Sequence, residues 1–174
     1  MRKFTIAGAL ASMLISTAAF AGDQYVDETG YAVSGYDVVA YFSLPQSAVG
    51  TAQTEAVRGS VDYVTEYNGA KFAFSSADNL AAFEADPEKY VPAFDGHCAY
   101  GAAQGGKVPA NPHLWRIVDD KLYLNITKNV VGFWEEDIPG NITKAYGNWD
   151  GGLEPAPASE STIPQYTSPG PLTH

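Results

Sequence analysis

The sequence has little cysteine and little histidine. Its 174 residues include one cysteine, Cys98, and three histidines. A single thiol cannot form a disulfide within the chain, and the absence of a Cys-x-x-Cys pair gives no support to a disulfide oxidoreductase. Three roles remain for Cys98: a buried structural residue, a metal ligand, or a thiol that pairs with another molecule.

Basic residues are also scarce. Ten Lys and Arg stand against 20 Asp and Glu, and the net charge is −10. Because no basic cluster is present, we do not expect the chain to bind nucleic acid or an anionic lipid surface. Aromatic residues are plentiful by contrast, with three Trp, eight Phe and eleven Tyr. They are enough to fill the core of one domain of this length.

Long apolar runs are absent except near the first residue. Arg2 and Lys3 precede an apolar stretch over residues 4–20, and Ala-Phe-Ala closes it. This order is typical of a secretory signal peptide with a small-x-small cleavage site. The stretch is short and interrupted by hydroxyl residues, so stable membrane insertion is not expected after cleavage. We predict a signal peptide over residues 1–21, a mature chain that begins at Gly22, and a periplasmic location.

Two β-rich segments predict hairpins. The first covers residues 61–76 and has Asn68-Gly69 at its turn, a strong hairpin signal. The second covers residues 114–126, with Asp119-Asp120 at the turn. Residues 31–42 alternate loosely and predict a further strand that leads into a short turn.

Helices are expected in two regions. Ser76 can cap a helix through residues 77–90, which Pro87 should interrupt. Residues 129–149 predict two helical pieces separated by Pro139-Gly140. Together with the hairpins, these helices predict a small α+β domain over residues 22–152.

The last part of the chain has a different composition. Residues 153–174 are rich in Pro, Ser and Thr and poor in apolar residues. Such a segment buries too little surface to offset the entropy of ordering. We therefore predict a disordered tail over residues 153–174.

Several motifs occur in one order between residues 35 and 150. They are GYDVVAYF, EYNGAKFAFSSADNLAAFEADPEKY, FDGHCAYG, LWRIVDDKLYLN and FWEEDIPGNI. Together they resemble the exported, stand-alone bacterial proteins of the YHS family. The resemblance implies a β-hairpin, a helix with an inward Phe and a closing Asp-Pro-x-Lys-Tyr. It places the YHS core at about residues 35–101 and a C-terminal hairpin with helices at 113–150.

The resemblance also bears on metal binding. Many YHS domains attached to metal-transporting pumps carry cysteines thought to hold soft or transition metals, at positions that correspond to Ala40, Ser75 and Asn79. All three thiols are missing here, so that chemistry does not carry over at those positions. The exported relatives usually have Gly-Tyr-Cys where this chain has Gly-His97-Cys98, and His97 thus adds a candidate ligand.

The candidate metal ligands are therefore Cys98, His97 and His113. Neighbouring residues aim at one site only in a loop, which Gly96 permits, and His113 would have to fold back across the glycine-rich segment. One thiol and two imidazoles suit copper better than the closed tetrahedron of zinc. The competing hypotheses are a buried structural thiol and a catalytic pair of Cys98 with His113, oriented by Asn111.

Asp37 is the other polar residue of interest, and we expect it to cap a turn or the start of a helix. The function expected from the sequence is an exported YHS-like binding module that handles a metal ion, copper or zinc. The alternatives are a metal-free domain that binds a periplasmic protein and, third, a thiol-dependent enzyme.

Overall fold

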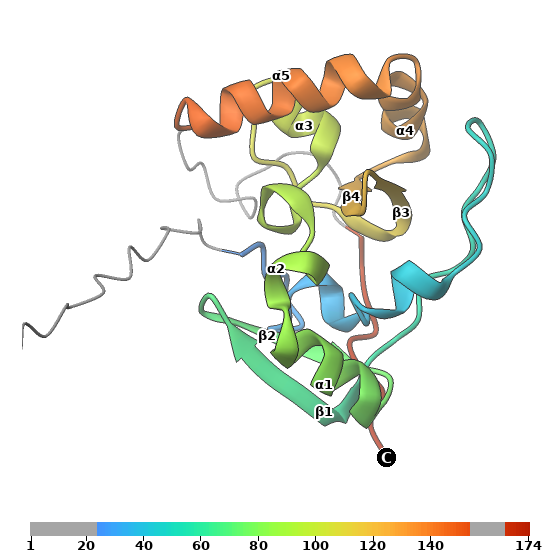
Figure 1. Ribbon diagram of the computed structural model, residues 1–174, viewed down its shortest axis with the longest axis vertical. Helices are drawn as coiled ribbons and strands as arrows, with labels where there is room; N and C mark the ends of the chain where they lie inside the picture. Colours follow the sequence, from blue (N-terminus) through green and yellow to red (C-terminus); the bar gives the residue numbers. More distant parts are fainter. Residues whose placement is uncertain (1–23, 154–165) are drawn as a thin grey trace, which may run out of the picture.

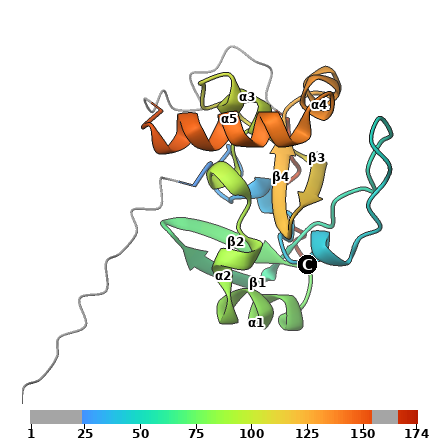
Figure 2. The same cartoon turned by 45° about the horizontal axis from the view of Figure 1, so that its top comes forward.

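The computed structural model describes residues 24–153 and 166–174, and it confirms a small α+β fold (Figure 1). Two separate antiparallel hairpins lie between two groups of helices (Figure 2). The elements in chain order are η1 (Val33–Gly35), η2 (Ala40–Ser43), β1 (Ser60–Tyr67), β2 (Ala70–Phe74), α1 (Ala77–Ala85), α2 (Pro87–Tyr90), η3 (Ala93–Gly96), α3 (Ala99–Ala103), β3 (Asn111–Val118), β4 (Lys121–Asn125), α4 (Lys128–Glu135) and α5 (Ile138–Asp150).

The predicted signal peptide, residues 1–21, lies outside the described residues. Within the part of the chain that is described, no helix has the length and apolar character needed to cross a bilayer.

Both predicted hairpins are confirmed. Asn68 and Gly69 join β1 to β2 with φ angles of 48° and 76°, and Asp119 and Asp120 join β3 to β4 with φ angles of 48° and 58°. Two consecutive residues with positive φ match the right-handed twist of the flanking strands. Asn, Asp and Gly tolerate this conformation better than other residues, which is why the turns could be located from the sequence.

The helices begin where side chains satisfy their first amides. The Ser76 hydroxyl accepts from the Asn79 amide (3.1 Å), and Pro87 opens α2, as predicted. The break between α4 and α5 differs from the prediction, because it lies before residue 138. Asp137 caps α5 by accepting from the Gly140 amide (3.0 Å). Pro139 stands in the first turn of α5, where a missing N–H leaves no helical bond unmade.

Residues 31–42 do not form the expected strand. Ser34 and Gly35 adopt φ angles of 56° and 78°, so the chain turns through η1 instead of extending. The Asp37 carboxylate then accepts from the Val39 and Ala40 amides and holds the start of η2. Local side-chain bonds of this kind compete with strand pairing.

The core has two clusters that meet at β4. Leu122 and Leu124 face the first cluster, around the aromatic residues of β2 and α1, whereas Tyr123 faces the second, around Trp134 and the small residues of α3. Successive side chains of a strand point to opposite sides, so one strand serves both clusters. The hairpin β3–β4 is thereby held between α3–α5 on one side and the β1–β2 hairpin with α1 and α2 on the other (Figure 2).

The end of the chain departs from the predicted disordered tail of residues 153–174. Residues 166–174 lie along the body, and the Leu172 amide and carbonyl bond to Gly59 and Val61. The prediction rested on low apolar content, but this segment docks mainly through hydrogen bonds of its main chain, which composition does not reveal. Residues 154–165 lie outside the described residues.

Candidate functional site

His97 lies at the end of η3 and is buried, with 4% of its surface exposed. Its Nδ1–H donates to the Phe94 carbonyl (2.9 Å), and its ring packs between Tyr25 and Trp149, with ring centroids 5.5 and 5.6 Å away. Burial lowers the pKa of His97 to about 4, although the bond to Phe94 opposes this shift. The imidazole is therefore neutral at neutral pH and serves the packing of this corner of the fold.

Cys98 follows as the N-cap residue of α3, and it is also buried. Its sulfur accepts from the Gly101 amide (3.4 Å) and donates to Oδ1 of Asn125 (3.4 Å). Asn125 Oδ1 also accepts from the Tyr100 amide (3.1 Å), so it ties α3 to the end of β4. Burial raises the pKa of the Cys98 thiol. A raised pKa is the opposite of what a nucleophile or thiolate ligand needs.

His113 lies elsewhere, on β3. Its Nδ1 accepts from the Ala56 amide (3.3 Å), and its Nε2 lies 3.1 Å from the hydroxyls of both Tyr36 and Tyr166. Because Nδ1 is an acceptor, the proton of the neutral ring sits on Nε2 and points to a tyrosine oxygen. Burial lowers the pKa of His113, which favours this neutral state.

The three predicted ligands are thus engaged in separate contacts. Across residues 24–153 and 166–174, no three His, Cys, Asp or Glu side chains gather closely enough to hold a metal ion. The catalytic hypothesis required His113 to pair with Cys98, but the partners of His113 are Ala56, Tyr36 and Tyr166. Asn111 instead accepts from the His113 amide through its side chain (2.9 Å).

The Asp37 carboxylate has the richest set of hydrogen bonds among the described side chains. Asp37 is fully buried, and its Oδ1 accepts from the Val39 and Ala40 amides (2.9 and 3.1 Å). Its Oδ2 accepts from the amide and hydroxyl of Ser75 (2.7 and 2.6 Å) and from the side-chain amide of Asn79 (2.7 Å). The predicted capping role is confirmed, but the bonds from β2 and α1 could not be foreseen.

Asp37 therefore joins the three positions at which the family resemblance implies cysteines. Ala40, Ser75 and Asn79 are neighbours in space, and each supplies a donor to this one carboxylate. No thiolate is present among them, and both Asp37 oxygens are occupied by N–H and O–H groups. These residues do not fit a soft metal ion, which prefers thiolate ligands.

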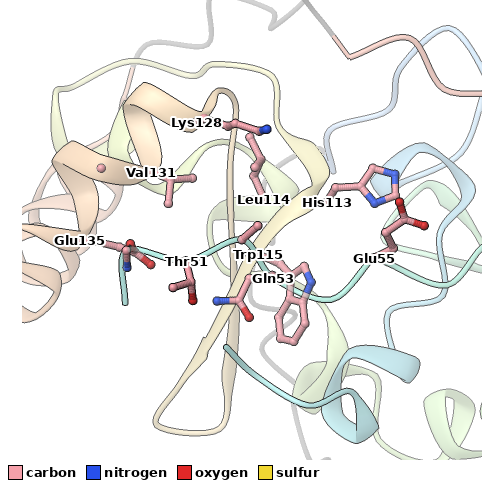
Figure 3. A pocket seen from close by; sticks show the side chains of 12 residues that line it. Thr51, Gln53, Glu55, His113, Leu114, Trp115, Lys128, Val131 and Glu135 are labelled. Carbon is pink, nitrogen blue, oxygen red and sulfur yellow. The ribbon is translucent and has the colours of Figure 1, made fainter. Parts of the chain in front are cut away.

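The structure also has a cleft beside β3 that the sequence did not predict. It encloses about 410 Å³ between the segment 50–55, β3 and α4 (Figure 3). Leu114 and Val131 supply apolar wall, Glu55 and His113 lie at one end, and Lys128 projects from α4 (Figure 3). No local motif marks this cleft, because its walls come from three separate parts of the sequence.

A buried ion pair lies at the α4 wall of the cleft. Arg116 and Glu135 are joined at 2.5 Å, and their side chains are only 7% and 6% exposed. Glu135 also accepts from the Gly50 amide (2.8 Å), and Trp115 donates to the Thr54 carbonyl (2.8 Å). The segment 50–55 is thus fastened to α4 at one end and to β3 at the other.

Comparison with known proteins identifies part of the chain. Residues 55–94, from the segment before β1 to the start of η3, match the family model of the YHS domain. This range lies inside the YHS core predicted at residues 35–101. No curated protein and no solved structure matches the chain.

Replacing Asp37 by Asn tests the hydrogen-bond hub. The variant keeps the shape but turns one acceptor oxygen into an NH₂ group that faces other donors. We expect Asp37→Asn to lower the free energy of unfolding by about 3 kcal/mol. Urea unfolding measures the change, and Asp150→Asn at an exposed site should stay within about 0.5 kcal/mol of wild type. Equal stability of the two variants would contradict the role given to Asp37.

His97 should make stability depend on pH. Because the pKa of folded His97 is lowered to about 4, the unfolded chain binds a proton first as the pH falls below about 6.5. Stability is then lost between about pH 6.5 and pH 4, by up to about 3 kcal/mol from this residue. Urea unfolding at both pH values should show a smaller loss in His97→Gln than in wild type. Identical losses of stability in wild type and His97→Gln would show that protonation of His97 does not destabilise the folded protein.

Proposed function

We propose that this YHS domain-containing protein is a binding module that acts in the periplasm and holds a small organic ligand in the cleft beside β3. The observation that carries the proposal is the cleft of about 410 Å³ between residues 50–55, β3 and α4. Sites for small molecules usually enclose about 300–1,000 Å³ and combine apolar walls with a few polar groups.

The lining indicates the kind of ligand. Leu114 and Val131 offer apolar contact, and the opposite charges of Glu55 and Lys128 stand at different parts of the rim (Figure 3). A ligand with an apolar body and one charged or hydrogen-bonding group would satisfy both kinds of surface. A purely ionic ligand would leave the apolar wall without a partner.

The bonds that fasten the segment 50–55 support binding without large rearrangement. The Arg116–Glu135 ion pair and the bond from Gly50 to Glu135 define one wall before any ligand arrives. A site that is already formed loses less conformational entropy on binding than one that must be ordered.

The contacts of the predicted ligands favour this function over copper or zinc handling. Cys98 is a buried thiol bonded to Asn125, His97 bonds to Phe94, and His113 bonds to Ala56 and two tyrosines. A metal ion would have to displace these partners and deprotonate a thiol whose pKa is raised by burial. A thiol-dependent enzyme would meet the same obstacle.

Export is proposed from the signal-peptide pattern of residues 1–21. If the pattern acts as proposed, the protein recovered from the periplasm should have the intact mass of a chain that begins at Gly22. A mass that includes residues 1–21 would indicate a retained N-terminal segment instead.

A glycine in the cleft wall allows the proposed site to be filled. Gly132 on α4 lines the cleft, and a Cβ atom placed on it meets no other atom within 4 Å. We expect 8-anilino-1-naphthalenesulfonate, an aromatic probe with one sulfonate, to bind native protein at one saturable site. Gly132→Phe should weaken this binding by at least about tenfold, or 1.4 kcal/mol.

Gly147→Phe is the matched control, because Gly147 is also a helical glycine with open space around it but lies away from the cleft on α5. It should bind the probe like wild type, and both variants should melt within about 3 °C of wild type. Equal binding by the two variants would exclude the cleft as the site of the probe.

The metal hypothesis is measured in parallel. Elemental analysis of untagged protein and of Cys98→Ser, after incubation with copper or zinc, should give no stoichiometric metal that depends on the thiol. Copper retained by wild type and lost in Cys98→Ser would overturn the proposal in favour of metal handling.

A further inference from the structure

The C-terminal segment, residues 166–172, lies against η1, the start of β1 and β3 (Figure 1, red). Its surroundings come from three places in the sequence: residues 34–36 around η1, residues 58–61 at the start of β1, and His113 on β3. We call this surface the tail groove.

Main-chain bonds fix the end of the segment. The Leu172 amide donates to the Gly59 carbonyl (2.7 Å), and the Val61 amide donates to the Leu172 carbonyl (3.0 Å). Leu172 thereby forms a parallel bridge with Ser60. β1 pairs with β2 along its other edge, so the segment begins a third strand beside the start of β1. This arrangement is β-strand addition, a common way of recognising extended peptides.

Two hydrogen bonds from the Arg58 guanidinium and the packing of Pro171 against Gly35 hold the centre of the segment. Arg58 donates from Nε to the Gly170 carbonyl (2.9 Å) and from Nη2 to the Pro171 carbonyl (3.3 Å). The Pro171 ring lies on Gly35, where an added Cβ atom would come within 2.5 Å of the proline Cδ. Gly170 and Pro171 are buried. The groove therefore recognises the main chain of the segment through Arg58 and its proline ring through Gly35.

The first residue of the segment is recognised through its hydroxyl. The Tyr166 oxygen lies 3.0 Å from the Tyr36 hydroxyl and 3.1 Å from Nε2 of His113. Ser168 adds a hydrogen bond from its hydroxyl to the Ser34 carbonyl (2.9 Å). A phenylalanine at position 166 could not make the contacts of the tyrosine hydroxyl.

The segment docks mainly through polar contacts, and its end stays partly exposed to solvent. Leu172 keeps 48% of its surface exposed. Most of the contacts are hydrogen bonds, whose net contribution is modest because the same groups bond to water when the segment is released. The attachment within one chain strengthens such binding, because a tethered segment has an effective concentration in the millimolar range. Without the tether, the same contacts correspond to a ligand that can leave and be replaced.

We infer that the tail groove is a peptide-recognition surface and that residues 166–172 are its intramolecular ligand. The partner that fits is an extended segment with a tyrosine and, four residues later, Gly-Pro followed by an apolar residue. The groove contributes the donors and acceptors, and the partner contributes main-chain groups and the tyrosine hydroxyl. This inference goes beyond the proposed cleft ligand and does not depend on it.

The full chain can test the inference once the tether is opened after folding. A specific protease site replaces residues 157–162, and the folded protein is then cut. A fluorescein-labelled synthetic peptide of residues 166–174 is added before and after cutting, and its anisotropy is measured. We expect the cut protein to bind the peptide at least about 30-fold more tightly than the uncut protein, in which the tethered segment competes.

Two changes to the contacts make the test specific. Arg58→Gln removes the guanidinium that donates to Gly170 and Pro171, and it should weaken peptide binding to the cut protein by at least about tenfold. Lys144→Gln, an exposed change on α5, should have no effect. On the peptide side, methylating the Leu172 amide removes the donor to Gly59 and should abolish binding even if Arg58→Gln fails to fold.

Two results would overturn the inference. The first is that the cut protein binds the peptide no better than a scrambled sequence of the same composition. The second is that the cut segment stays with the body for days without exchanging. Either result would make residues 166–172 a fixed part of the fold. A cut Gly132→Phe protein that still binds the peptide would separate this groove from the cleft.

Discussion

The buried carboxylate of Asp37 is the interaction on which the YHS core depends. Burying a carboxylate is costly unless hydrogen bonds replace its water. Here five donors do so, from Val39, Ala40, Ser75 and Asn79. Val39 and Ala40 stand at the start of η2, Ser75 follows β2 and Asn79 lies in α1, so one side chain ties together three elements. Moving any of these elements would leave part of the carboxylate unsatisfied, and this penalty keeps them in place.

This hub also occupies the place at which the family resemblance implies cysteines. Ala40, Ser75 and Asn79 are still neighbours, but the bonds that join them run to a carboxylate instead of a metal ion. Cys98, the one remaining thiol, has a raised pKa because it is buried. The Cys98 thiol and the imidazoles of His97 and His113 are thus held in neutral, hydrogen-bonded states. The two sites that we propose, the cleft beside β3 and the groove at the start of β1, would recognise their partners by shape and hydrogen bonding.

His113 stands where those two surfaces meet. It lines the cleft beside Glu55, and its Nε2 faces Tyr36 and Tyr166 of the tail groove. Its Nδ1 accepts from Ala56, so the tautomer of the ring is set by the backbone. A ligand in the cleft and a peptide in the groove would therefore contact the same imidazole from different sides. This shared residue gives the two proposed sites a physical connection, while their separate walls keep their partners distinct.

Local signals determined the hairpin turns and most helix starts from the sequence. Asn68-Gly69, Asp119-Asp120 and Ser76 act on neighbours within a few residues, so their effect can be read from short stretches. The order of the YHS motifs likewise identified the domain that residues 55–94 confirm. The strand expected at residues 31–42 did not form, because the Asp37 side chain accepts hydrogen bonds from amides that a strand would have used for pairing.

The sites could not be read in this way, because their contacts join residues far apart in the chain. Cys98 meets Asn125 27 residues away, Asp37 meets Ser75 38 residues away, and His113 meets Tyr166 53 residues away. The sequence by itself determined which residue types were present: one thiol, few imidazoles and no family cysteines. Only the tertiary structure decided which of them meet, because burial and packing select partners by position in space. That selection gave His97, Cys98 and His113 different partners and placed the Tyr166 hydroxyl against Tyr36 and His113.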